Sequence, residues 1–154
     1  MIKKIQRIYI LLILLILSLT ACQSQKKEAE DLTGIPIDTE KTESVSIYYG
    51  SICYSFFDES KETIAKVADL FHGFSLEEVP DGALDSATTY QIYFSNTDGQ
   101  TAAINVDENG MFYLADSKKF YEISKGVFHL EELEKIYEDS MNAGGIDKNQ
   151  CLIP

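Results

Sequence analysis

The residues that could carry catalysis are few in this chain. Nucleophilic catalysis needs a nucleophile, a base and a group that orients the base. The chain has two histidines, His72 and His129, and each falls at the end of a predicted helix, which is an ordinary surface position. A Cys/His pair such as Cys53 with His72 is left open, and the sequence holds no motif such as Gly-x-Ser-x-Gly. We therefore expect no enzymatic activity.

Carboxylates are abundant, and adjacent pairs occur at Glu77-Glu78, Asp107-Glu108 and Glu131-Glu132. These pairs fall in predicted turns or on a predicted solvent face of a helix. Asp98 and Asp107 fall in hairpin loops, where aspartate bonds the local backbone. Neither loop has the spacing of a calcium-binding loop with its terminal glutamate. We expect no metal ion and no cofactor.

The chain is strongly acidic, with 25 Asp and Glu against 13 Lys and Arg and a formal net charge of −12. Such a balance repels the phosphates of nucleic acids and anionic lipid head groups. We therefore expect no nucleic acid partner. The charge would favour a basic partner or diffuse cation binding, or it serves only to keep the domain soluble.

The N-terminus has the layout of a signal peptide. Lys3, Lys4 and Arg7 precede an apolar run over Ile8–Leu17, and a polar chain follows Cys22. An apolar core of about a dozen residues spans roughly 18 Å at 1.5 Å per residue, short of the ~30 Å of a bilayer core. A cleaved signal fits this length better than a membrane-spanning helix.

Leu19, Thr20, Ala21 and Cys22 close this segment, and at these positions the chain resembles bacterial membrane lipoproteins. Their lipobox is an aliphatic residue, a short residue, a small residue and an invariant cysteine. The resemblance implies that residues 1–21 are cleaved and that Cys22 carries a diacylglycerol thioether as the mature N-terminus. It places the protein on the extracytoplasmic face of the cell membrane, held there by its lipid anchor. It covers only the first 22 residues, and an ordinary secretory signal or an uncleaved anchor are the alternatives.

Residues 22–43 are polar and charged and have no sustained apolar period. We read them as the lipidated cysteine followed by a flexible, disordered linker. In the alternative interpretation, Ile35 and Ile37 on either side of Pro36 form an extended segment that docks on the domain.

Residues 44–143 are predicted to form one globular domain, followed by a tail over 144–154. Ser44–Phe57 alternates as a strand or a bent strand pair that breaks at Gly50. Apolar stripes with helical spacing predict helices over Glu59–His72 and Phe128–Asn142. A short strand is predicted over Phe74–Val79.

From Thr89 the chain reads as a meander of four short strands. Asn109-Gly110 predicts a hairpin with a type I′ turn, because both central residues of that turn need positive φ. The predicted fold class is α+β, an antiparallel sheet of about four to six strands with two helices packed on one face.

Cys53 and Cys151 remain after lipidation of Cys22. An even pair outside the cytoplasm permits a disulfide. The alternative is two unpaired thiols, with Cys53 packed as a small apolar residue.

Tyrosines are numerous, and strand alternation must place some of them on each face of the sheet. If one face is left open, Tyr48, Tyr54, Tyr93 and Tyr113 could line a surface for a protein or peptide partner; otherwise they are core and scattered half-buried residues. The expected function is a membrane-anchored, non-catalytic protein or peptide interaction module. The alternative is a small-ligand or cation-binding lipoprotein for uptake or sensing.

Overall fold

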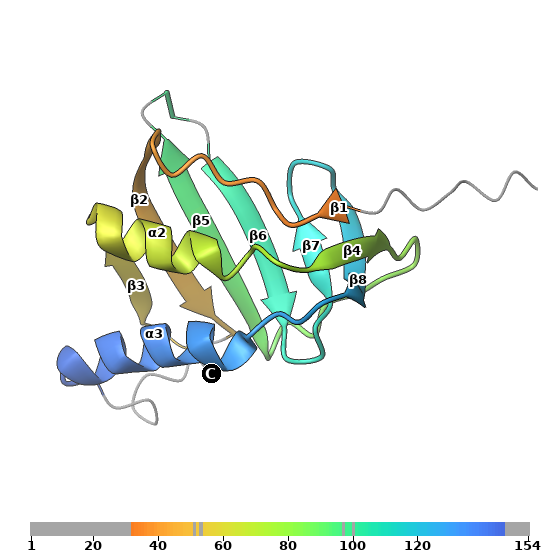
Figure 1. Cartoon of the computed structure of the whole chain (residues 1–154). Coiled ribbons are helices and arrows are strands. Elements are labelled where there is room, and N and C mark those ends of the chain that lie inside the picture. The colour runs from red at the N-terminus through yellow and green to blue at the C-terminus, as the bar shows by residue number, and fades with distance from the viewer. Residues whose placement is uncertain (1–31, 51, 53, 97, 100, 147–154) are drawn as a thin grey trace, which may run out of the picture.

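The computed structural model describes residues 32–50, 52, 54–96, 98–99 and 101–146. These residues form an antiparallel eight-stranded sheet in the order β1-β4-β8-β7-β6-β5-β2-β3, together with two helices (Figure 1). The predicted α+β class is confirmed. The strands are β1 Leu32–Thr33, β2 Thr42–Tyr49, β3 Ser55–Asp58, β4 Ser75–Glu78, β5 Thr89–Asn96, β6 Thr101–Asp107, β7 Phe112–Leu114 and β8 Lys119–Lys125; the helices are α2 Lys61–Asp69 and α3 Leu130–Ala143.

The prediction of four to six strands is an undercount. The stretch read as one strand or a bent pair is two separate strands, β2 and β3, and Gly50 lies between them at a φ of +48°. The strand β1 is two residues long and pairs with β4. A strand of two residues has no period that alternation could reveal, so this element was missed.

The predicted flexible linker, residues 22–43, extends too far toward the C-terminus. Residues 32–43 belong to the fold, because Gly34 N–H donates to Phe74 O and Ile35 N–H donates to Phe71 O. Ile35 is buried, as the docking alternative required. Lys61 Nζ donates to Thr39 O at 3.1 Å and to Thr42 O at 2.6 Å, and so holds the end of this segment against α2.

Both helices cover the same face of the sheet, hereafter the inner face (Figure 1). Ser60 caps α2 by accepting Thr63 N–H at 3.3 Å, and Ile64, Val67 and Ala68 form its buried stripe. This stripe and the one on α3 match the predicted helical spacing. Leu133, Tyr137 and Met141 are the buried residues of α3.

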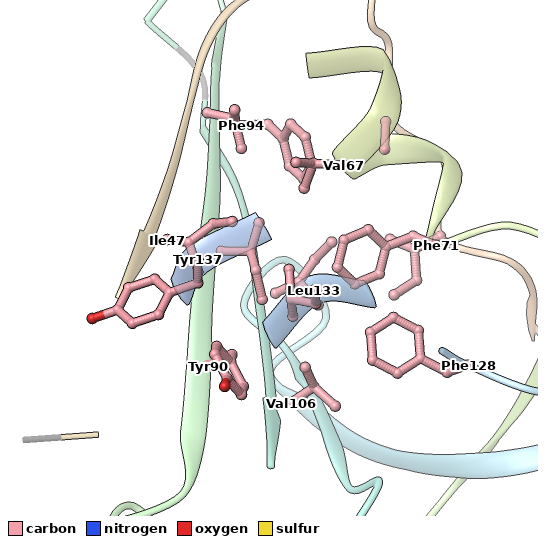
Figure 2. Packing of buried hydrophobic residues seen from close by; sticks show 14 of the residues in the cluster. Ile47, Val67, Phe71, Tyr90, Phe94, Val106, Phe128, Leu133 and Tyr137 are labelled. Atoms are coloured by element: carbon pink, nitrogen blue, oxygen red, sulfur yellow. The ribbon is translucent and has the colours of Figure 1, made fainter. Parts of the chain in front are cut away.

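Side chains fill the space between helices and sheet. Phe71 and Phe128 stack at 5.4 Å between ring centroids, and Figure 2 shows Leu133 between them and the strands. The sheet contributes alternate residues, all of them buried: Val45, Ile47, Ile92, Phe94, Ile104 and Val106.

A buried carboxylate organises the β6–β7 hairpin. Asp107 Oδ1 accepts the N–H groups of Asn109 and Met111, and its Oδ2 accepts the N–H of Asp85, each at 3.0 Å. Gly110 N–H donates to Asp107 O, and Gly110 has a φ of +80°. The predicted hairpin is therefore present, but the predicted type I′ turn is wrong, because Asn109 does not have a positive φ. The bonds to Asp107 instead hold a turn whose central residues are Glu108 and Asn109.

Asp107→Ala is expected to lower the free energy of unfolding by about 2–4 kcal/mol, because three backbone N–H groups lose a charged acceptor. Urea denaturation would measure the change. The control is Asp81→Ala, at an exposed turn position, for which a change within about 0.5 kcal/mol is expected. Equal stability of the two variants would contradict this role.

Candidate interaction surface

The opposite face of the sheet, hereafter the outer face, carries the alternate residues of the same strands. The strand register sets these side chains in two rows across the sheet. One row runs through Ser55, Tyr48, Gln91, Asn105, Tyr113 and Phe120; the other runs through Phe57, Ser46, Tyr93 and Ala103.

The outer face is uncharged over β3, β2, β5, β7 and the part of β6 up to Asn105, in the part of the chain that the structure describes. This is notable in a chain of which 25% of residues are charged. Acidic residues begin at its margins, where Glu77 pairs with Glu122 on β4 and β8 and Glu43 lies near the start of β2. Depletion of charge at the centre of a surface is typical of protein interfaces.

Aromatic rings stand on this uncharged face in fixed arrangements. Tyr48 and Tyr93 meet edge to face at 5.8 Å, and Tyr113 and Phe120 lie at 5.0 Å between centroids. Tyr93 OH donates to Gln91 Oε1 at 3.1 Å. Because neighbours hold these rings, little rotamer entropy is left to lose on binding.

The face is open to solvent at its β2–β3 side. Phe57 is 59% exposed and Tyr48 is 43% exposed. Next to them lies a shallow depression of about 400 Å³ that is lined by Ser46, Tyr48, Gln91, Tyr93 and Ser95. Its lining of aromatic rings, hydroxyls and an amide can make both apolar contacts and neutral hydrogen bonds.

Of the four tyrosines predicted for the surface, Tyr48, Tyr93 and Tyr113 lie on the outer face. Tyr54 does not lie with them. Its hydroxyl is 2.7 Å from Ser140 Oγ of α3, and its ring packs against Tyr137 at 5.4 Å. The alternation of β3 could have predicted this placement. Phe56 points inward, so Tyr54, two positions earlier, lies on the same side. Phe57 points outward, and the sequence prediction of the surface did not include it.

A second cluster of tyrosines, on the inner side, contains Tyr49, Tyr90 and Tyr137. Tyr49 lies 4.3 Å from Tyr90, and Tyr137 lies 6.1 Å from Tyr90 and donates to Tyr54 O. Burial raises the pKa of Tyr137 from 10.0 to about 12. Burial also raises the pKa of Tyr49 and Tyr90, with further contributions from Glu108 on Tyr49 and Glu134 on Tyr90.

These raised pKa values predict a loss of stability in alkali. The unfolded chain ionises its tyrosines near pH 10, whereas the folded chain keeps them protonated, so the unfolded state binds fewer protons above that pH. The contribution of these tyrosines to the free energy of unfolding is therefore expected to be fully present below about pH 10. It should fall as the pH rises toward about 12. Urea denaturation across this range measures the fall, Tyr137→Phe should reduce it, and a flat profile would contradict the prediction.

Each of the two histidines considered for catalysis lies beside a single carboxylate. His72 Nδ1 is 3.7 Å from Asp69 Oδ1, and His129 Nδ1 is 3.0 Å from Glu131 Oε1. Each pair joins neighbours in the sequence on an exposed helix end. Within the described ranges, no group of three or more His, Cys, Asp or Glu residues is placed to hold a metal ion.

Two of the paired carboxylates are bound by side chains from distant parts of the sequence. Glu78 Oε2 binds Lys119 Nζ at 2.6 Å, and Tyr49 OH donates to Glu108 Oε1. The lipobox residues 19–22 and the cysteines Cys53 and Cys151 lie outside the described residues, so the predicted lipidation and disulfide stay predictions.

Two hollows lie beside the N-terminal segment on the inner side of the sheet. They have volumes of about 520 and 320 Å³ and share Pro36, Ala102 and Asp116. The segment between β1 and β2 passes over this region in Figure 1. The space under the two helices is instead filled by the core residues of Figure 2.

Comparison with known proteins returns no match among protein-family models, curated proteins or solved structures. The class that the fold defines is thus an α+β domain with one covered and one open sheet face. None of the helices in the described part of the chain is long and apolar enough to cross a membrane.

Proposed function

We propose that this protein is a lipid-anchored, extracytoplasmic module that binds a protein or peptide partner through the outer face of its sheet. One observation carries the proposal: the outer face is uncharged and aromatic in a chain whose formal net charge is −12. A face that only met water would have no need to exclude charge. Aromatic and amide side chains around Tyr93 and Gln91 match the composition of protein interfaces.

The chemistry of the face limits the class of partner. Its hydrogen-bonding groups are hydroxyls and amides, on residues such as Ser46, Gln91 and Asn105, which suit neutral polypeptide surfaces. Nucleic acid is disfavoured, because no basic side chain lies on the described outer face and acidic Glu77 and Glu122 flank it.

The lipobox at Leu19–Cys22 supports the membrane anchor. Leu32 of β1 lies ten positions after Cys22, and a fully extended chain covers at most about 3.6 Å per residue. The domain would therefore sit within about 35 Å of the bilayer surface. At that height it can reach partners at the membrane or in the layer next to it.

Intact-mass measurement of the membrane-extracted protein tests the anchor. We expect a mass for Cys22–Pro154 plus two or three acyl chains, because acylation of Cys22 accompanies cleavage before it. Cys22→Ser should leave the signal uncleaved and remove the acyl mass. An unacylated full-length chain from the unsubstituted protein would contradict the anchor.

Site-specific photo-crosslinking in cells that naturally produce the protein tests the binding face. Tyr48 and Tyr93 are each replaced by benzoylphenylalanine, and the control replaces Glu132, which is exposed on α3. We expect the same adduct from Tyr48 and Tyr93 and none from Glu132, because only the outer face meets the partner. Adducts of equal yield at all three positions, or at none, would contradict the proposal.

A further inference from the structure

We infer that the partner is an extended peptide segment that pairs with β3 as an additional strand and lays its side chains beside Phe57 on the outer face. This inference rests on the proposed function and specifies its partner. It follows from three features of β3: its unpaired edge, the exposed aromatic residue on it, and the charge around it.

The outer edge of β3 is free to pair within the described part of the chain. Ser55–Asp58 pairs with β2 on one side, and no hydrogen bond to another described residue occupies its other side. In an antiparallel ladder, alternate residues of an edge strand direct both N–H and C=O outward. Such groups form a template for another strand.

The ends of β3 are held in place, so the template is formed before binding. Tyr54 O, just before the strand, accepts Tyr137 OH at 2.8 Å from α3. Asp58 Oδ1, at its other end, accepts Ser60 N–H at 2.7 Å where α2 begins. Because β3 is already ordered at both ends, it loses little conformational entropy when a partner binds.

The opposite edge of the sheet lacks these properties. There Pro36 follows the described residues of β1, Leu32 and Thr33, after two residues. Proline is one device that blunts an edge strand. On β3, Ser55 and Phe57 face outward without charge, and Phe57 is 59% exposed.

The chemistry of the peptide follows from its neighbours. Side chains of an added strand that point to the outer face would lie next to Phe57, so alternate apolar residues are favoured there. The segment from the end of β3 to the first turn of α2 is acidic. It carries three carboxylates, on Asp58, Glu59 and Glu62, and one cation, on Lys61. The peptide should therefore carry Lys or Arg beyond its apolar residues.

The inference is tested by selection of binding peptides from a displayed random library. The peptides are about ten residues long, enough for one strand, and the target is the full mature chain. We expect selected peptides to alternate apolar and polar residues, to carry a basic end, and to slow amide hydrogen exchange at Ser55–Asp58. N-methylation of alternate residues in one of the two possible phases should weaken binding by about tenfold or more, since each methyl removes an N–H that pairs with β3.

A matched pair of variants locates the site. Phe57→Lys should weaken binding of a selected peptide by about tenfold, because it adds a charge to the edge and repels the basic end. Val127→Lys is the control, since Val127 is 63% exposed and lies in the loop before α3, away from β3. Circular dichroism confirms that both variants are folded.

The outcomes separate the inference from the proposed function. Peptides that protect Gln91 and Tyr93 but not β3, or that tolerate N-methylation in either phase, would overturn strand addition and leave the outer face as the binding surface. Failure to select any peptide, with crosslinking at Tyr93 still positive, would likewise overturn the inference alone. If crosslinking at Tyr48 and Tyr93 is also negative, the proposed function fails as well.

Discussion

The structure depends on burial of one face of a single antiparallel sheet. Strand alternation sends Val45, Ile47, Ile92 and their neighbours to the inner face, where they remove apolar surface from water against two helices. Both helices are needed on that side, because each offers only one apolar stripe. The N-terminal segment with Ile35 closes the region that the helices leave open. Both helices of the described part of the chain lie on the inner side, so no described element covers the outer face.

The open outer face is therefore a direct consequence of the fold, but its composition is not. A solvated face of an acidic protein would ordinarily carry charge, and the neighbouring strands β4 and β8 do carry Glu77 and Glu122 there. The central strands carry Tyr93, Gln91 and Asn105 instead. The inner core leaves the outer face open, and the edge strand β3 places the same uncharged surface beside backbone groups that no described residue pairs with.

Much of the fold could be read from periodicity. Both helices, the meander and the β2–β3 break at Gly50 follow from local patterns, because each buries a stripe or an alternating face of its own residues. The two-residue β1 could not be read, since its position depends on Leu76 of β4 rather than on its own sequence. The hairpin at Gly110 was readable, whereas its turn geometry was set by the buried carboxylate of Asp107.

The candidate surface divides in the same way. By itself, the sequence determined the acidic balance and the alternation that puts Tyr48, Tyr93 and Tyr113 on strand faces. Only the tertiary structure decided which face the helices cover, that Tyr54 turns inward to Ser140, and that Phe57 stands exposed at an edge. Alternation is a local property of one strand, whereas exposure depends on which distant element packs against it.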